Sequence, residues 1–287
     1  MRGISKQQLI DDFRNLGIEQ GDFLFITGDL LRVGYFQRQR KDLYNDWMEI
    51  LKEVVGSDGD IIVAAYSNTF FSFKKNKDLI FTKDSPTICG SLSDLFLKSE
   101  GTFRSSHPTN SYVGFGKRAS KVLNKHDANS TSYQVVEDIL EYKAKNLLMG
   151  TIDKSNAPMA FHQVLFKLGY NNKHPFSGLG QVYYFNENGE KKLFTRYDVG
   201  GCSGGSYKLL PELLNLESTR YGNIGNSKTL VLDGKDSFDA IDNVLRKNIS
   251  SCKCNDVSCV SCYGRLYSLT MLPSWLLNLN KIIKRLR

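Results

Sequence analysis

A chain of 287 residues with 41% hydrophobic and 24% charged residues has the composition of a globular protein with one domain. The formal net charge is +8, but the last seven residues, "KIIKRLR", carry four of the positive charges, so the remainder gives little indication of nucleic-acid binding. No run approaches the roughly 18 apolar residues of a membrane span, and "MRGISKQQLIDDF" has acidic residues where a signal peptide is apolar. We therefore expect a cytoplasmic protein without a nucleic-acid partner.

The first part of the chain alternates between amphipathic helices and short buried strands. Apolar residues at helical spacing predict helices over 5–17, 42–56 and 89–101. The continuously apolar runs "GDFLFIT" (21–27) and "GDIIVAAY" (59–66) predict strands that are buried on both faces. Helices and strands that alternate with tight turns indicate parallel strand pairing and hence an α/β fold.

The second part of the chain continues this pattern and then changes. Two alternating aromatic runs around "NENGE" in residues 181–199 predict a β-hairpin. The other expected elements are short helices over 119–126 and 132–142, a third buried strand over 144–151, a helix over 157–170, and a strand followed by a helix over 228–248.

The polar loop "FRSSHPTNSYVGFG" (103–116) is the first candidate for a site. Arg104 can form paired hydrogen bonds with a phosphate or carboxylate, and the hydroxyls of Ser105 and Ser111 can bind a ligand or close turns within the loop. His107 precedes a proline, which restricts its backbone to an extended conformation and gives its side chain a defined direction. The residue types alone leave a ligand site and an internal turn network as equal alternatives.

His162 is the second candidate. It lies on the helix that follows the strand expected over 144–151, and the carboxyl ends of strands are where open α/β sheets bind ligands. Asp153 lies in the connecting turn, where a carboxylate could orient the imidazole of a general base. The alternative is that Asp153 caps the loop and His162 is a packing residue.

Four of the six cysteines, Cys252, Cys254, Cys259 and Cys262, fall within eleven residues. In a cytosolic chain such a cluster indicates a metal more than disulfides, and four thiolates suit one tetrahedral zinc ion. We predict a structural zinc site, with free or redox-active thiols and an iron–sulfur cluster as alternatives. The glycine-rich "GGCSGGS" (200–206) lacks the lysine of a phosphate-binding loop and is expected to be flexible.

The end of the chain, "LYSLTMLPSWLLNLNKIIKRLR" (266–287), predicts a basic amphipathic helix. With the Cys-rich segment (251–265) it is expected to form a C-terminal appendage, 251–287, beyond a domain of residues 1–250. Its apolar face could contact the inner membrane face or a protein partner. Packing on the domain itself or in a homodimer is the alternative.

The stretches "GIEQGDFLFITGDLLRVG", "GDIIVAAYS", "FRSSHPTNSYVGFGKRA" and "NLLMGTIDKSNAPMAFH" follow one another over roughly residues 1–170. In order and spacing they resemble the aminoglycoside 3-N-acetyltransferase family, also called the antibiotic N-acetyltransferases. The resemblance implies a single layered α/β/α domain. It also implies an acyltransferase that uses acetyl-CoA as co-substrate to acetylate a primary amine on a sugar.

The resemblance also implies roles for individual residues. His162 matches the catalytic histidine, which acts as the general base that removes the proton of the amine. His107 matches the loop that lines the site between coenzyme A and the acceptor, and Asp153 is expected to orient His162. The expected contacts of coenzyme A are Thr27, Gly28, Arg104, Ser105 and Ser111.

Two departures from the family pattern bear on the substrate. "TGDL" (27–30) replaces the family's "HSSL", and a carboxylate at Asp29 would repel the coenzyme A phosphates unless it points elsewhere. Leu165 replaces a glutamate one helical turn after the histidine, which argues against a polycationic aminoglycoside. We therefore expect a singly charged amino sugar, free or nucleotide-linked, as acceptor in surface polysaccharide biosynthesis. The alternatives are antibiotic resistance and an inactive relative that binds a ligand or partner.

Overall fold

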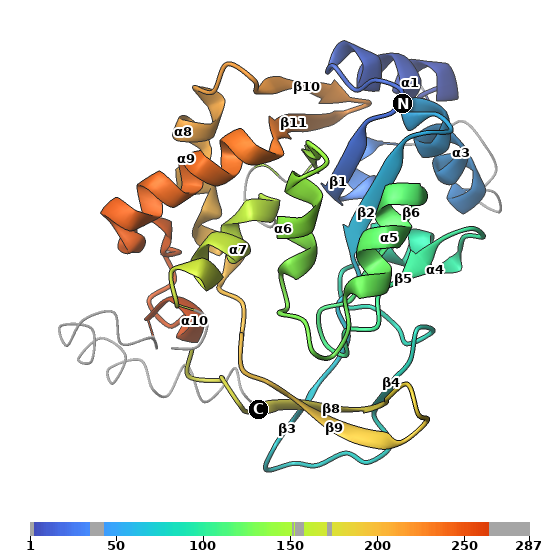
Figure 1. Ribbon diagram of the computed structural model, residues 1–287. Coiled ribbons are helices and arrows are strands. Elements are labelled where there is room, and N and C mark those ends of the chain that lie inside the picture. The colour runs from blue at the N-terminus through green and yellow to red at the C-terminus, as the bar shows by residue number, and fades with distance from the viewer. Residues whose placement is uncertain (1–2, 35–42, 151, 153–157, 171–173, 264–287) are drawn as a thin grey trace.

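The chain is built around one mixed β-sheet. The computed structural model describes residues 3–34, 43–150, 152, 158–170 and 174–263. Within these residues, seven strands form a sheet in the order β10-β11-β7-β1-β2-β6-β5 (Figure 1). The strands are β1 (Phe23–Gly28), β2 (Asp60–Ala64), β5 (Phe103–Arg104), β6 (Tyr112–Phe115), β7 (Lys145–Met149), β10 (Arg220–Ile224) and β11 (Ser227–Asp233).

The centre of the sheet is parallel. β1 lies between β7 and β2 and is parallel to both, with Phe25 opposite Ile62 and Asn146. The predicted parallel pairing is therefore confirmed. β6 pairs antiparallel with β2, and β11 pairs antiparallel with β7, which the sequence did not predict because a buried apolar strand has the same pattern in either direction. The carboxyl ends of β7, β1 and β2 thus meet at one edge of the sheet.

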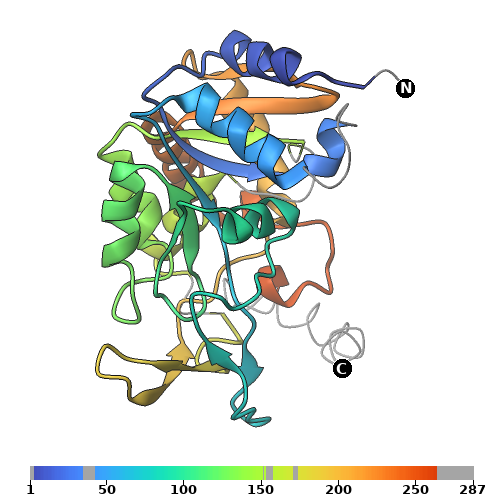
Figure 2. The same ribbon diagram turned by 90° about the vertical axis from the view of Figure 1, so that its right-hand side faces the viewer.

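Helices cover both faces of the sheet. Along β1, Leu24 and Ile26 face one side and Phe23 and Phe25 face the other, because successive side chains of a strand alternate. The first side packs against α1, α3 and α4, and the second against α5, α6, α7 and α9, so the molecule has three layers (Figures 1 and 2). The helices are α1 (Lys6–Asn15), α3 (Leu43–Val55), α4 (Ser91–Lys98), α5 (Lys117–Lys125), α6 (Gln134–Leu140), α7 (Met159–Lys167) and α9 (Gly234–Lys247).

A smaller sheet lies beyond the central one, at the bottom of Figure 1. The predicted β-hairpin is confirmed, because the two longest strands of this sheet, Gly180–Phe185 and Lys191–Arg196, pair antiparallel. The Asn186 side chain closes the turn between them by accepting the backbone N–H groups of Asn188 and Glu190. Gly189 supplies the positive φ of 75° that this turn requires. The strands of this sheet are β3 (Phe70–Phe71), β4 (Ile80–Phe81), β8 (Gly180–Phe185) and β9 (Lys191–Arg196).

The C-terminal part returns to the main sheet. The strand and helix predicted over 228–248 are β11 and α9, and the Asp233 carboxylate caps α9 by accepting the N–H groups of Lys235 and Asp236. Residues 203–206 form the start of a 3-10 helix where a flexible loop was predicted. The remaining short elements are α2 (Leu30–Val33), η3 (Ser203–Leu209), α8 (Leu210–Leu214), η4 (Ile249–Cys252) and α10 (Val260–Tyr263).

The predicted amphipathic helix of 266–287 lies outside the described residues. Among the helices that the structure does describe, none has the length and apolar character needed to cross a bilayer. The described part of the Cys-rich segment packs against η3, which places it next to the site described below.

Candidate active site

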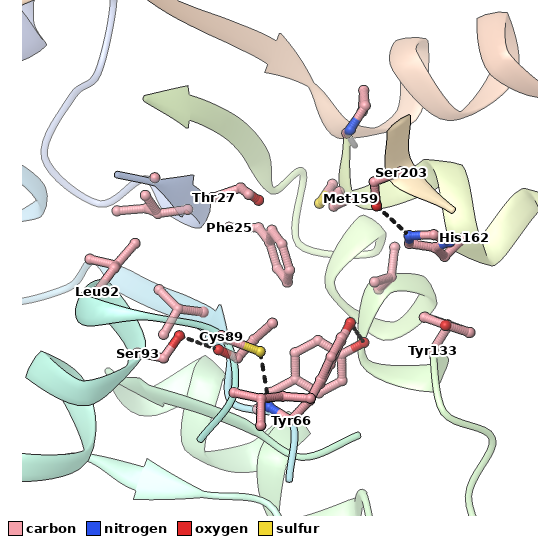
Figure 3. Close-up of a pocket in the computed structure, with 18 residues that line it drawn as sticks. Phe25, Thr27, Tyr66, Cys89, Leu92, Ser93, Tyr133, Met159, His162 and Ser203 are labelled. Atoms are coloured by element: carbon pink, nitrogen blue, oxygen red, sulfur yellow. Dashed lines mark hydrogen bonds between the residues drawn. The ribbon is translucent and has the colours of Figure 1, made fainter. Parts of the chain in front are cut away.

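A pocket of about 320 Å³ opens where strands β1 and β2 end and helices α4 and α7 begin (Figure 3). Thr27 and Gly28 line it from the end of β1, and Tyr66 lines it just after β2. Their predicted contact with coenzyme A stays a prediction. Ligands of open α/β sheets bind at the carboxyl ends of the strands, so this is the expected place for a site. The other lining residues are Phe25, Ile26, Val63, Ala64, Ile88, Cys89, Leu92, Ser93, Tyr112, Tyr133, Val136, Pro158, Met159, His162 and Ser203.

His162 reaches this pocket from the first turns of α7 (Figure 3). Its Nε2 atom lies 3.2 Å from the hydroxyl oxygen of Ser203. Its ring stacks on Tyr133, with centroids 5.6 Å apart and an interplanar angle of 23°. The imidazole is half-buried. A ring that is held by a hydroxyl group and an aromatic face has a defined direction, which a general base needs in order to meet its proton.

A buried asparagine fixes the start of α7. Asn146 on β7 has no exposed surface, its Nδ2 donates to the carbonyl of Phe25 at 3.0 Å, and its Oδ1 accepts the N–H of Met159 at 2.8 Å. Met159 is the first residue of α7, three residues before His162. One amide therefore connects β7, β1 and the helix of the candidate base, and sets the distance between His162 and the end of β1.

The opposite wall of the pocket contains two tyrosines and a thiol. The hydroxyls of Tyr66 and Tyr112 lie 3.4 Å apart, and the Cys89 sulfur accepts the N–H of Tyr66 at 3.2 Å (Figure 3). Burial raises the pKa of the Cys89 thiol. Because the thiolate is the nucleophilic form of cysteine, burial makes this thiol less reactive.

Tyr66, Tyr133 and Ser203 are among the pocket residues that the sequence analysis did not predict. Tyr66 follows the strand "GDIIVAAY", and its place at the carboxyl end of a buried strand was the available signal. Ser203 lies in "GGCSGGS", which was recognised only as a glycine-rich loop. Tyr133 carries no local signal, because an aromatic residue before a helix is usually a packing residue.

The loop 103–116 supports the pocket and contributes only Tyr112 to its described lining. His107 is fully buried, and its Nδ1 accepts the backbone N–H groups of Thr109 and Asn110 at 3.3 and 2.9 Å. The Ser105 hydroxyl accepts the N–H of Tyr112 at 2.9 Å. Of the two alternatives for this loop, these bonds favour the internal turn network, while its role towards a ligand stays a prediction.

Arg104 is the centre of this internal network. It is 5% exposed and joins β5 to the end of β2. Burial lowers its pKa to about 10, so the guanidinium is still charged at neutral pH. The sequence analysis predicted that Arg104 contacts coenzyme A, but in the structure the guanidinium contacts carbonyl and hydroxyl oxygens of the chain itself. Its N–H groups donate to the hydroxyls of Ser67 and Ser111 and to the carbonyls of Ala65, Lys83 and Ser85.

Two buried histidines predict a pH-dependent stability. The rings of His107 and His126 stack with centroids 4.8 Å apart. Burial lowers the pKa of His126 to about 4 and that of His107 well below its usual value. Both are neutral in the folded state but bind protons near pH 6.5 when unfolded. The free energy of unfolding should therefore fall between pH 6.5 and about 4, by about 1.4 kcal/mol per pH unit for each histidine.

Urea unfolding at pH 7, 6 and 5 measures this effect. A His126→Gln variant should show a shallower dependence on pH than the parent chain, because one of the two groups no longer titrates. Parallel curves for the two proteins would contradict the assignment.

The two departures from the family pattern also have structural explanations. Asp29 caps the short helix α2 (Leu30–Val33) by accepting the N–H of Leu31 at 3.0 Å, and it lies 3.5 Å from Arg32 Nε. It does not line the pocket, so its charge is directed elsewhere. Leu165 packs in the apolar core under α7. Asp153 lies outside the described residues, and its role stays a prediction.

Four cysteines gather in the structure, but they are not the predicted four. The sulfur atoms of Cys202, Cys254, Cys259 and Cys262 all lie within 4.8 Å of one another. Cys252 is outside this group, because its place in η4 directs its thiol to the carbonyl of Ile249 at 3.2 Å. The fourth member, Cys202, directly precedes η3, and the packing of η3 against the Cys-rich segment places its sulfur beside the other three.

Comparisons with known proteins agree with this architecture. A family model described as aminoglycoside 3-N-acetyltransferase matches residues 25–246. No curated protein sequence shows significant similarity to the chain.

Solved structures with low sequence identity share the fold. The YokD protein from Bacillus subtilis has a TM-score of 0.73 and 17% identity, over 87% of this chain and 96% of its own. AAC-IIIb, in a binary complex with CoASH, has a TM-score of 0.67 and 18% identity, over 86% and 97%. A mutant of aminoglycoside acetyltransferase AAC(3)-IVa in complex with a gentamicin has a TM-score of 0.72 and 17% identity, over 91% and 96%. With a family model that matches most of its length, the chain belongs to the aminoglycoside 3-N-acetyltransferase family of acetyl-CoA-dependent acyltransferases.

Proposed function

We propose that this enzyme transfers the acetyl group of acetyl-CoA to a primary amine of an amino sugar that carries a single positive charge. The observation that supports this proposal is the composition of the pocket: its described lining includes His162 but no aspartate or glutamate. A polycationic acceptor needs carboxylates to balance its charges when it leaves water. A single ammonium group loses its charge when it gives its proton to a base, so it needs no such partner.

In the proposed reaction, the acceptor ammonium first loses one proton to solvent, since a protonated amine has no free electron pair. The amine nitrogen then forms a bond with the acetyl carbonyl carbon while His162 takes the second proton from the nitrogen. The bond from the carbonyl carbon to the sulfur of coenzyme A breaks, and the proton on His162 passes to this sulfur, so coenzyme A leaves as the thiol. Ser203 and Tyr133 hold the imidazole in place during this transfer. A base positioned in this way contributes roughly 10²- to 10⁴-fold to the rate.

The acceptor can be tested with a panel of amines. We expect kcat/KM for amino sugars with one amine, free or nucleotide-linked, to exceed that for gentamicin by at least about tenfold, because a site without carboxylates discriminates against further charges. Release of free coenzyme A thiol measures turnover, and the N-acetylated form of each sugar is the blank. A preference for gentamicin would contradict the proposal. The role in surface polysaccharide biosynthesis stays a prediction.

Aminoglycoside acetylation is the second candidate, because the similar AAC(3)-IVa structure contains a gentamicin. It predicts that cells expressing the chain tolerate more gentamicin, whereas unchanged tolerance favours the amino-sugar proposal. Calorimetry with coenzyme A tests the remaining alternative. No heat of binding would indicate an inactive relative that acts as a binding module.

A further inference from the structure

We propose that Cys202, Cys254, Cys259 and Cys262 bind one zinc ion, and that this ion fixes the segment that places Ser203 against His162. The four sulfur atoms lie within 4.8 Å of one another, and all six cysteines of the chain are free of disulfides. In a tetrahedral site with Zn–S bonds of about 2.3 Å, neighbouring sulfurs are about 3.8 Å apart. The four side chains therefore already have nearly the spacing of a metal-bound set.

The surroundings of the sulfur atoms suit a closed structural site. Cys254 and Cys262 are 6% and 5% exposed. The backbone N–H of Gly204 donates to the Cys202 sulfur at 3.2 Å, and the N–H of Cys254 donates to the Cys262 sulfur at 3.4 Å. Such hydrogen bonds orient thiolate ligands. Four protein sulfurs occupy all four coordination positions of a tetrahedral zinc ion and leave none for a substrate, so the role of the ion is structural.

The geometry favours a single ion over an iron–sulfur cluster. With Cys202 as the distant ligand, the spacing C-x₄-C-x₂-C from Cys254 to Cys262 also matches the ligands of a two-iron cluster. In such a cluster the cysteines bind different irons, so some sulfur pairs are much farther apart than others. Here every pair among the four sulfur atoms lies within 4.8 Å. A compact tetrahedron of thiolates around one ion is typical of zinc.

The site connects two distant parts of the chain beside the pocket. Cys202 directly precedes Ser203, whose hydroxyl oxygen lies 3.2 Å from His162 Nε2. The η3 backbone lies close to the Cys-rich segment, because a Cβ atom on Gly205 would come within 2.0 Å of the Cys252 carbonyl oxygen. A bound ion adds metal–sulfur bonds to this contact. In this proposal the zinc ion stabilises the start of η3, and with it the position of the Ser203 hydroxyl beside His162.

The metal site is tested on the full-length chain, loaded with zinc, dialysed and measured by elemental analysis. We expect about one zinc per chain in the parent protein and in Cys252→Ser, and less than about 0.2 in Cys202→Ser and Cys259→Ser. Cys252 is a matched control because it is buried, two residues from a ligand and outside the cluster. Equal zinc in the parent and Cys202→Ser, loss of zinc in Cys252→Ser, or a parent chain without metal would overturn the proposal.

A spectroscopic measurement covers the case in which the variants do not fold. Cobalt(II) added to the metal-free parent chain should give the intense visible bands of a tetrahedral thiolate complex at one ion per chain. Iron together with acid-labile sulfide in the purified protein would overturn the assignment to zinc.

The positioning role has its own readouts. After removal of zinc with a chelator, amide hydrogen exchange should become faster over residues 203–209 and stay unchanged in β1 and β7. Unchanged exchange over 203–209 would overturn the positioning role. The effect on turnover rests on the proposed function: the zinc-free enzyme and Ser203→Ala, which retains zinc, should show the same altered pH profile of kcat/KM. If the acetyl transfer proposal fails, no protein turns over, yet zinc content and exchange still decide this inference.

Discussion

Replacing His162 by alanine should lower kcat for acetyl transfer at least about 10²-fold at pH 7. The acceptor amine must lose a proton as it attacks the thioester, and His162 is the histidine that lines the pocket and lies 3.2 Å from Ser203. Without this base, only the small fraction of acceptor that is already deprotonated reacts. The rate of the variant should therefore rise with pH as the amine itself titrates. Initial rates of thiol release between pH 6 and pH 9 measure this.

Two controls separate loss of a base from loss of structure. The affinity for coenzyme A and the unfolding midpoint should change little, because His162 is half-buried and sits at the pocket surface. Imidazole added to the solution should restore part of the activity, since a free base can occupy the space that the substitution leaves. A loss of less than about tenfold, with normal coenzyme A binding, would mean that another group removes the proton.

Replacing Arg104 by alanine should lower the free energy of unfolding by about 3–5 kcal/mol. Arg104 is 5% exposed and lies in the interior. Its removal leaves two hydroxyl groups and three carbonyl groups without their charged hydrogen-bond donor. Buried oxygen atoms that lose their donors must bear the cost of desolvation. Urea denaturation measures the change. Arg104→Lys should give an intermediate loss, because one ammonium group cannot replace the planar arrangement of five donors.

A surface arginine gives the matched control. Arg246 on α9 pairs with Asp242 one helical turn away at 2.6 Å and is largely exposed, so Arg246→Ala should leave stability nearly unchanged. The opposite outcome is informative as well. If Arg104→Ala folds with parent stability but binds coenzyme A more weakly, the role predicted from the sequence is right and the structural role is wrong.

The parts of the site that the sequence predicted depend on local patterns. β1, β2 and β7 are apolar on both faces, which is visible in any short window, and parallel strands place their carboxyl ends together. The pattern placed His162 on the helix after such a strand, and the family resemblance placed Thr27 and Gly28 after β1; in the structure all three line one pocket.

The parts that were missed depend on contacts between distant segments. The polar groups of 103–116 suit a phosphate and the chain's own backbone equally well. Only the fold shows that Arg104 donates to the carbonyl of Ala65 and that the Ser105 hydroxyl accepts the N–H of Tyr112. Cys202 lies about fifty residues before the other three cysteines of its cluster. The prediction used Cys252 as the fourth ligand because it is closer to those three in the sequence. Spacing along the chain cannot identify a partner that tertiary packing brings in.

The position of β11 in the sheet has a consequence for synthesis and folding of the chain. β11 pairs with β7 over five residues, from Thr229 opposite Met149 to Asp233 opposite Lys145. A growing chain contains β7 long before β11 has been made, and until then one edge of a central apolar strand has unpaired N–H and C=O groups. Such edges are sites of aggregation in partly folded chains. Once β11 has been made, it pairs this edge of β7 and removes the unpaired groups.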